Sequence, residues 1–427
     1  MIKILDIKNL QASDFLSRRI EDYGEYEGAV REIIAKVRAE GDAALRFYAE
    51  KFDKVELAEL EVSKEEMESA WARVSDEYKV MLERAANNIR EFHKMQLKDG
   101  FEMKRPDGTI LGQKYTPIAK VGIYVPGGTA SYPSTVLMNA IPAKVAGVGE
   151  IVMTTPPDKQ GKIRDEILAA AKLAGVDRIF KIGGAGAVAA LAYGTESVPR
   201  VDKITGPGNI FVALAKKEVF GTVGIDMVAG PSEILVIADS SAKAETVAAD
   251  MLSQAEHDRF ASAVLVTDSA ELAEKVRDEI ERQLPLLERE EIARASIENN
   301  GKIIVAEDLD KVIEISNEIA PEHLELCVDE PFDMLEKVKN AGSVFLGRFC
   351  PEALGDYFAG PNHTLPTSGT AKFSSPLSVD DFVKRSQFIY YPKEAFESVA
   401  LSVDRFAREE GLTGHGRSAT IRLEETE

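Results

Sequence analysis

Four of the five histidines in this 427-residue chain lie in polar, charged or glycine-rich segments where a side chain can do chemistry. They are His257, His323, His363 and His415. Neutral imidazole is the most common metal ligand in proteins, and it titrates near neutral pH. These positions are therefore the first candidates for metal binding or acid–base catalysis.

Gln254 and His257 are three residues apart near the end of a predicted helix, 242–257, so both side chains share one face. Asp356 lies in a long irregular segment of the kind that often carries functional residues, and His415 stands between two glycines. Together these four residues form a nitrogen and oxygen ligand set suited to Zn²⁺. The alternative for each is an ordinary solvated side chain at a helix end or in a loop.

Glu322 and His323 follow a proline at the start of a predicted strand, 324–328. α/β enzymes often keep their chemistry at the ends of sheet strands. A carboxylate beside an imidazole supplies two groups for general acid–base catalysis. The alternative is a capped turn without chemistry.

Three glycine-rich turns suggest a nucleotide or another anionic ligand. Residues 183–189 contain G-x-G-x-x-A between a predicted strand and helix, which is the context of a dinucleotide-binding turn, and Asp202 follows at about the distance of a ribose-binding acid. The other two turns are 124–129 and 205–209. Small-residue packing is the alternative.

Strands and helices alternate from residue 119 onward, which predicts βαβ units and mainly parallel sheets. There are enough strands for two such sheets. Residues 1–100 show the helical period, 105–120 show a hairpin pattern, and about 379–408 read as a final helical stretch. The predicted class is α/β.

Composition excludes several kinds of protein. The net charge is −20, from 52 Lys and Arg against 72 Asp and Glu, which argues against a nucleic-acid partner. No apolar run approaches the length of a membrane helix, and the N-terminus lacks a secretory pattern. Cys327 and Cys350 form no metal-binding spacing and no disulfide framework. We therefore expect a cytoplasmic protein that does not bind membranes.

The ordered set of motifs along the chain closely resembles the histidinol dehydrogenase family. The matching segments carry two of the three glycine-rich turns, three of the four metal candidates and the acid–base pair; they are 122–128, 205–209, 229–234, 253–257, 320–325, 360–367 and 411–415. Each segment is short, but their joint order is specific. The resemblance implies oxidation of L-histidinol to L-histidine through an aldehyde, with two NAD⁺ and one Zn²⁺ per subunit, as the last step of histidine biosynthesis.

The resemblance also assigns roles to individual residues. It implies Gln254, His257, Asp356 and His415 as zinc ligands that also contact the substrate, and Glu322 and His323 as the catalytic acid–base pair, with His323 also contacting the substrate. Further substrate contacts are implied at Ser232, His363 and Glu410, and NAD contacts at Tyr124, Gly186 and Asn209. The family commonly has glutamine where this chain has Gly186, so one amide is missing from the implied NAD site.

The implied fold has two incomplete Rossmann-like parallel-sheet domains with helical N-terminal and C-terminal extensions. We expect an N-terminal arm over 1–20, a first domain over 21–121 and 233–376, a second domain with the NAD contacts over 122–232, and a dimerisation tail over 377–427. The resemblance further implies a homodimer with shared active sites.

Two other functions compete with this interpretation. One is a paralogous zinc and NAD dehydrogenase of another small alcohol, such as a sulfonated diol. The other is a regulatory protein that binds metal or nucleotide without turnover. The combination of Glu322, His323, His363 and Glu410 disfavours both, because neither needs that recognition and acid–base set.

Overall fold

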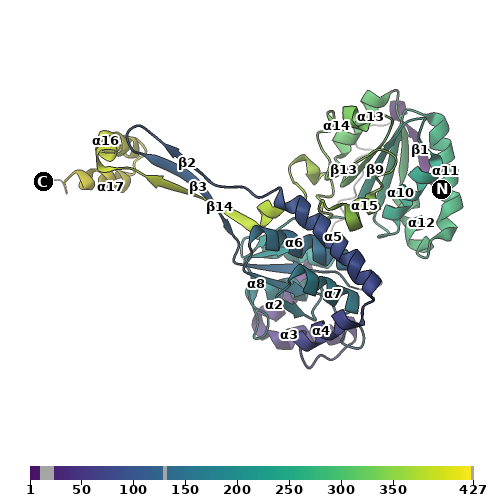
Figure 1. Ribbon diagram of the computed structural model, residues 1–427, viewed down its shortest axis with the longest axis horizontal. Helices are drawn as coiled ribbons and strands as arrows, with labels where there is room; N and C mark the ends of the chain where they lie inside the picture. Colours follow the sequence, from purple (N-terminus) through teal and green to yellow (C-terminus); the bar gives the residue numbers. More distant parts are fainter. Residues whose placement is uncertain (10–23, 128–131, 425–427) are drawn as a thin grey trace. The chain divides into compact units, whose positions relative to one another are not determined.

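The computed structural model describes residues 1–9, 24–127 and 132–424. Its contacts divide the chain into two compact units (Figure 1). The first unit comprises Met1–Gln96 and Ile118–Phe382, and the second comprises Leu97–Pro117 and Val383–Glu427. Two parallel sheets form the first unit, which confirms the predicted α/β class.

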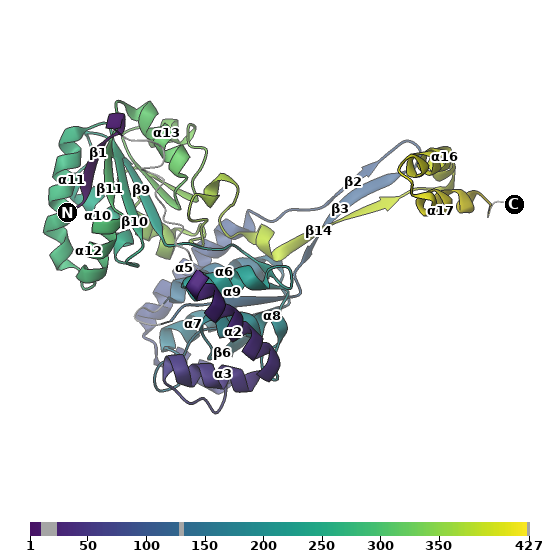
Figure 2. The ribbon, with the colours of Figure 1, turned by 180° about the vertical axis from the view of Figure 1, so that it is seen from behind.

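The larger sheet of the first unit has six parallel strands in the order β1-β11-β10-β9-β12-β13 (Figure 2). The strands are β1 (Lys3–Asp6), β9 (Glu233–Ala238), β10 (Ser262–Thr267), β11 (Lys302–Val305), β12 (His323–Cys327) and β13 (Ser343–Leu346). The associated helices are α10 (Ala244–Ala255), α11 (Ala270–Gln283), α12 (Glu290–Asn299), α13 (Leu309–Ile319), α14 (Pro331–Leu335) and α15 (Glu352–Leu354). Short turns of helix are η1 (Ile7–Asn9), η3 (Leu284–Leu286), η4 (Gly355–Ala359), η5 (Thr370–Lys372) and η6 (Val379–Phe382).

Each face of this sheet carries its own apolar core. Ile234 and Val236 of β9 pack with α10, α11 and α12, whereas Leu235 and Ile237 pack with α13 on the opposite face. A strand that is buried on both faces has no polar side to expose, which explains the unbroken apolar run over 234–238 in β9. The same alternation decides where each side chain of β12 points.

The smaller sheet has five parallel strands in the order β6-β5-β4-β7-β8. The strands are β4 (Lys120–Tyr124), β5 (Glu150–Thr154), β6 (Arg178–Phe180), β7 (Lys203–Thr205) and β8 (Gly224–Ile225). Helices α6 (Pro133–Ala146) and α7 (Asp165–Ala174) pack together, as do α8 (Gly184–Tyr193) and α9 (Ile210–Val219). In the five-stranded sheet the first strand, β4, lies at the centre, and in the six-stranded sheet β9 lies inside; the strand order reverses beside each of them, as in doubly wound folds.

The N-terminal helices pack on the smaller sheet's layers. They are α2 (Gly24–Glu40), α3 (Asp42–Tyr48), η2 (Ala49–Asp53), α4 (Lys64–Arg73) and α5 (Asp76–Lys94). Helix α2 contacts α8 and α9, α4 contacts α7, and α5 contacts α6. Residues 30–60 thus share a core with 124–223 and not, as we expected, with 233–376. Helix α5 contacts both α6 and η4, so this helix also touches the expected partner.

The start of the chain belongs to the other sheet. Strand β1 pairs in parallel with β11, so residues 3–6 form an edge strand. The expected N-terminal arm, 1–20, otherwise lies largely outside the described residues.

The second unit is an antiparallel sheet with two helices. Strands β2 (Phe101–Lys104), β3 (Ile110–Pro117) and β14 (Val383–Tyr390) form the sheet, and α16 (Lys393–Glu409) packs with α17 (Thr413–Glu424). The β2–β3 pair confirms the hairpin predicted over 105–120. The prediction of helix across 379–408 is wrong for 383–390, because those residues pair along the whole length of β3.

Among the described residues, no helix is both long and apolar enough to cross a membrane. Both cysteines are free.

Candidate active site

Several of the predicted site residues meet at the amino end of the six-stranded sheet. His323 begins β12 beside Ile234 of β9, and Gln254 lies at the end of α10. Asp356 belongs to η4, which follows α15. We expected chemistry at a strand end under the rule for doubly wound sheets, but that rule refers to carboxyl ends. Here the residues gather at the opposite edge, because α10 runs back past the strands and ends there.

His323 is the central side chain of this cluster and is only 4% exposed. Its Nδ1 lies 3.0 Å from the carbonyl oxygen of Glu233. A carbonyl only accepts, so Nδ1 carries the proton and Nε2 is left to exchange one. The Gln254 amide nitrogen lies 3.1 Å from the same Nδ1, and this amide can exchange its oxygen and nitrogen by a half-turn.

Two further histidines show the same arrangement. His257 Nδ1 lies 3.1 Å from the carbonyl oxygen of Ser253, and His363 Nδ1 lies 3.1 Å from that of Asp356. Each ring therefore donates from Nδ1 and keeps a lone pair on Nε2, the form needed to ligate a metal or accept a proton. His363 Nε2 accepts from the Thr135 hydroxyl at 3.4 Å. The backbone thus sets the tautomer at all three positions.

A buried carboxylate that the sequence analysis missed completes the cluster. Glu352 is 2% exposed, and its Oε1 lies 3.9 Å from His323 Nε2, while Asp356 Oδ1 lies 3.6 Å from the same nitrogen. One ligand atom from each of these three residues lies within 4.8 Å of the others. Glu352 precedes Asp356 by four residues, a helical spacing that could have revealed it.

Two buried polar atoms point into this cluster without a hydrogen-bond partner among the described residues: His323 Nε2 and Glu352 Oε2. Native proteins rarely leave such atoms unsatisfied unless a ligand, ion or water uses them. His257 and His363 are close enough for their charges to lower the pKa of Asp356. The donor set of imidazole, carboxylate and amide fits Zn²⁺.

The electrostatics favour a positive charge at this place. Burial raises the pKa of Glu322 to about 8 and that of Glu352 to about 7. Burial opposes protonation of His323, but the carboxylates of Glu352, Glu322 and Asp356 raise its pKa well above the usual value. Burial also works to raise the pKa of Asp356, yet the nearby imidazoles of His323, His363 and His257 hold it below its usual value. A proton or a metal ion would offset the clustered negative charge.

Glu322 is held by the main chain rather than by a cation. Its Oε2 accepts a hydrogen bond from the backbone nitrogen of Glu233 at 2.8 Å and lies 3.7 Å from His323 Nδ1. The side chain is 7% exposed. The Glu322 carboxyl therefore lies beside the imidazole of His323, and only its Oε2 accepts from the Glu233 nitrogen.

The remaining predicted contacts are more scattered. Ser232 is half-buried directly before β9, and its carbonyl accepts from Ser262. Glu410 and His415 belong to the second unit, where both are exposed. His93, which we did not select as a site residue, is a fully buried core histidine that contacts Gln96.

The predicted NAD contacts lie on the five-stranded sheet. Tyr124 ends β4, and its hydroxyl accepts from the backbone nitrogen of Gly184 at 3.1 Å. Asn209 caps α9 by accepting from the nitrogens of Phe211 and Val212. Tyr124 lies at the carboxyl end of β4 and Asn209 follows that of β7, and these two strands flank the reversal of strand order where doubly wound folds bind ligands.

Two details of the predicted nucleotide site differ from expectation. Asp202 lies before β7 and its carboxylate accepts from Lys120 at the start of β4, so it stands at the amino edge and not beside Gly184. Gly186 is buried in the first turn of α8, and a Cβ there would meet only Leu45, at 3.7 Å. Residues 128 and 129 of the turn at 124–129 lie outside the described residues.

A buried ion pair holds the glycine-rich turn that precedes Asn209. Lys216 and Asp226 are 2% and 1% exposed and form a direct ion pair. Asp226 accepts from the nitrogen of Gly206 at 2.8 Å, and Lys216 donates to its carbonyl at 3.0 Å. Sequence patterns did not reveal this ion pair, because Lys216 and Asp226 belong to different segments of the chain.

We expect Asp226→Ala to lower the free energy of unfolding by about 3–5 kcal/mol, because it leaves the Lys216 ammonium buried without its partner. Denaturant unfolding measures the loss. Lys217→Ala is the control: its ion pair with Glu27 is exposed, so its removal should change stability by about 1 kcal/mol or less. Equal effects would show that Lys216 finds compensation elsewhere.

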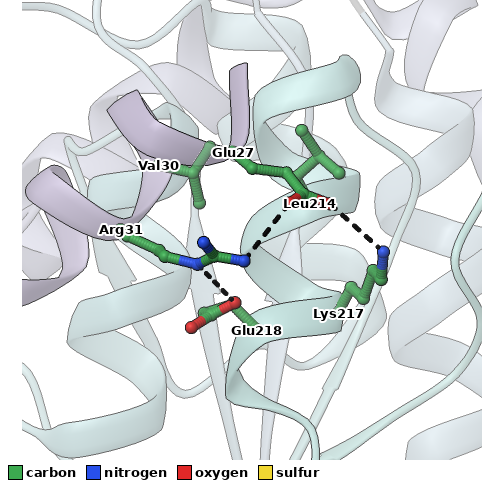
Figure 3. A pocket seen from close by; sticks show the side chains of 6 residues that line it. All are labelled: Glu27, Val30, Arg31, Leu214, Lys217 and Glu218. Atoms are coloured by element: carbon green, nitrogen blue, oxygen red, sulfur yellow. Dashed lines mark hydrogen bonds and ion pairs between the residues drawn. The ribbon is translucent and has the colours of Figure 1, made fainter. Parts of the chain in front are cut away.

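That control residue lines a small cavity between α2 and α9 (Figure 3). The cavity is about 40 Å³ and is bordered by Glu27, Val30, Arg31, Leu214, Lys217 and Glu218. Arg31 pairs with Glu27 and Glu218. A space of this size holds a few waters and is too small for a substrate or a dinucleotide.

Comparison with known proteins agrees with the fold. The family model described as histidinol dehydrogenase matches residues 16–423. The chain is 57% identical to a histidinol dehydrogenase of Streptococcus mutans over 93% of both chains, and 54% identical to that of Geobacter metallireducens over 99% of this chain and 98% of the relative.

A solved structure supports the same relationship. The crystal structure of histidinol dehydrogenase from Elizabethkingia anophelis superimposes with a TM-score of 0.93 at 38% identity, covering 99% of this chain and 98% of that one. The sequence match, the shared fold and the near-complete coverage lead to one conclusion: the chain belongs to the histidinol dehydrogenase family and is an oxidoreductase.

Proposed function

We propose that this enzyme oxidises L-histidinol to L-histidine through L-histidinal, with two NAD⁺ and one Zn²⁺ per subunit. The observation that carries the proposal is the buried His323, whose Nε2 has no hydrogen-bond partner among the described residues and faces Asp356 and Glu352. Relatives at more than half identity are named for the same activity. The last step of histidine biosynthesis and a cytoplasmic location are part of this proposal.

Within this proposal Gln254, His257, Asp356 and His415 hold the zinc. When bound, the ion supplies a Lewis acid that the amine and imidazole of histidinol can reach as ligands, which orients the alcohol. Ser232, His363 and Glu410 complete substrate binding. The backbone hydrogen bonds that set the tautomers of His257 and His363 support these roles, since they leave Nε2 available.

In the first half-reaction His323 accepts the alcohol proton at Nε2 while the carbon gives up a hydride. Its Nδ1–H remains on the carbonyl oxygen of Glu233, so the ring keeps its orientation during the transfer. The bound NAD⁺ supplies the hydride acceptor, and Tyr124, Asn209 and the turn at Gly186 are the proposed contacts. The product of this step is the aldehyde.

In the second half-reaction water must add to the aldehyde before another hydride can leave. Glu322 accepts a proton from that water, because it is the buried carboxyl beside His323 and its position is fixed by the backbone nitrogen of Glu233. His323 then takes the hydroxyl proton of the hydrate as the second hydride departs. Two hydrides leave one substrate, so two NADH form for each histidine.

Assaying NAD⁺ reduction with L-histidinol tests the proposal directly. Two NADH for each histidine formed would support it, and one NADH would point to an ordinary alcohol dehydrogenase. Turnover of another small alcohol, such as a sulfonated diol, without turnover of histidinol would favour the paralogous function.

Removing the metal is expected to abolish turnover without unfolding the protein. The two cores of the six-stranded sheet are built from apolar side chains that do not depend on the proposed ligands. Chelation should therefore leave the far-UV circular dichroism spectrum near that of the untreated enzyme. Asp356→Asn and His257→Ala should resemble the chelated enzyme.

Readdition of zinc to the chelated enzyme is the control for this experiment and should restore activity. Loss of the native spectrum on chelation would contradict the expectation, because the metal would then hold the fold and not the substrate.

A further inference from the structure

A second pair of acidic side chains, the half-buried Asp250 and the buried Glu325, lies next to the candidate metal site on two of its elements. Asp250 is one helical turn before Gln254 on α10, and Glu325 is two residues after His323 on β12. These spacings place each acid on the same face as its partner in the site. Leu324 and Leu326, on either side of Glu325 in β12, pack into the core on the opposite face of the sheet.

Glu325 connects three segments of the chain. It is 1% exposed, and its Oε1 accepts a hydrogen bond from the backbone nitrogen of Glu352 at 2.7 Å. One oxygen of its carboxyl lies within 4.8 Å of a carboxyl oxygen of Asp250, so the two acids interact directly. The thiol of Cys327, 3.9 Å away, donates to Oε2.

A hydrogen bond between two carboxyl groups needs one proton, since two carboxylates can only accept. Burial raises the pKa of Asp250 and raises that of Glu325 well above its usual value. Both shifts favour one shared proton, which lets the pair connect α10 to β12 without placing two negative charges side by side.

The hydrogen bond to Glu352 extends the connection to the third segment. Glu352 begins α15, and Asp356 follows one turn later in η4. Gln254, His323 and Asp356 thus stand on three elements that meet at one buried pair.

We infer that Asp250 and Glu325 are positioning residues that set the spacing of Gln254, His323 and Asp356 and thereby the zinc affinity of the site. The inference rests on the proposed function for the identity of the metal. It concerns residues that do not touch the metal, the substrate or NAD. Replacing a residue that holds metal ligands in place without binding the metal itself commonly changes metal affinity by about 10–100-fold.

Glu325→Met tests the inference because methionine has a similar size but cannot accept the Glu352 hydrogen bond. We expect zinc to bind about 10–100-fold more weakly in competition with a chromophoric chelator, measured on the full-length protein. Glu325→Gln should bind zinc nearly as the wild type does, since its amide oxygen can accept from Glu352 and its amide nitrogen can donate to Asp250.

Leu326→Ala is the matched control for general destabilisation. It lies next to Glu325 on β12 but faces the opposite core, so it should lower the melting temperature and leave zinc affinity unchanged. Asp250→Ala removes the other member of the pair, on α10. Because Asp250 is only half-buried, this variant tests the inference even if Glu325→Met does not fold, and it should also weaken zinc binding.

The outcomes separate this inference from the proposed function. Wild-type zinc affinity in folded Glu325→Met or Asp250→Ala would overturn the inference and leave the metal site intact. Absence of zinc from the wild-type protein would overturn the metal site and the inference together. A second zinc per chain that disappears in Glu325→Met would also overturn it, because Asp250, Glu325 and Cys327 would then be ligands themselves.

Discussion

Glu322→Gln is expected to slow the oxidation of histidinal by about 10²–10⁴-fold, the usual cost of losing a general base. A carboxamide cannot take a proton from water, but it keeps the size of the side chain and can still accept from the Glu233 nitrogen. His323 and the proposed zinc ligands stay in place. The oxidation of histidinol should therefore fall much less, and single-turnover rates with each substrate measure the difference.

The pH dependence of the second half-reaction gives an independent check. Burial raises the pKa of Glu322 to about 8, so the carboxyl is largely protonated below that pH and cannot act as a base. Histidinal oxidation should rise with pH up to about 8 and then level off. The Glu322→Gln variant should not show this rise of histidinal oxidation with pH.

His323→Asn is the matched control, because the adjacent imidazole takes a proton in both half-reactions of the proposed mechanism. It should slow histidinol and histidinal oxidation alike. If Glu322→Gln also slowed both steps equally, Glu322 would act by positioning His323 and not by activating water.

Mixing His415→Ala with His257→Ala is expected to restore about a quarter of wild-type activity, although each variant is inactive alone. The prediction follows from the proposed two-fold dimer in which Glu410 and His415 complete the partner's active site. One site of each heterodimer would carry both lesions and the other neither. Random pairing makes half of the dimers heterodimers, and each has one intact site of two.

The second unit offers a surface that fits such a partner. Large apolar side chains on β14 and α16 remain exposed, among them Ile389 at 72%, Leu401 at 68% and Phe406 at 70%. Soluble proteins rarely leave so many apolar residues of one small unit in water unless another chain covers them. His415 and Glu410 belong to this same unit.

A mixture of His257→Ala with Asp356→Asn is the control for subunit complementation. Both residues belong to the first unit, so every proposed site in that mixture carries a lesion and no activity should return. No recovery with His415→Ala, despite demonstrated subunit exchange, would show that His415 serves its own chain.

Local patterns predicted most elements of the fold correctly because their signals are contained in short segments. The apolar run at 233–238 and the alternation of strands with helices identified the parallel sheets, and the turn near Asp107 identified the β2–β3 hairpin. Local patterns did not predict strand β14. Five of its eight residues are polar or charged, and it forms by pairing with β3, which lies more than 250 residues earlier.

The same distinction applies to the site. Residue types and spacing selected His257, His323 and Asp356, whose roles remain predictions. They did not reveal Glu352 or the Asp250–Glu325 pair, because carboxylates are common and only burial separates these from solvated ones. Asp202 had a suitable spacing but lies at the wrong edge of its sheet, since spacing along the chain does not specify which end of a strand a residue occupies.

The sequence by itself determined the α/β class, the family and the candidate chemical groups, because these depend on residue type, order and local periodicity. Tertiary structure alone decided that the N-terminal helices pack on the five-stranded sheet and that the candidate site lies at the amino edge of the six-stranded one. It also decided the tautomers of three histidines and the burial of Glu322, Glu325 and Glu352. These properties arise from contacts between segments distant in the chain. Burial there changes the free energy of a charged group, and a backbone carbonyl oxygen stabilises the proton on the ring nitrogen that it faces.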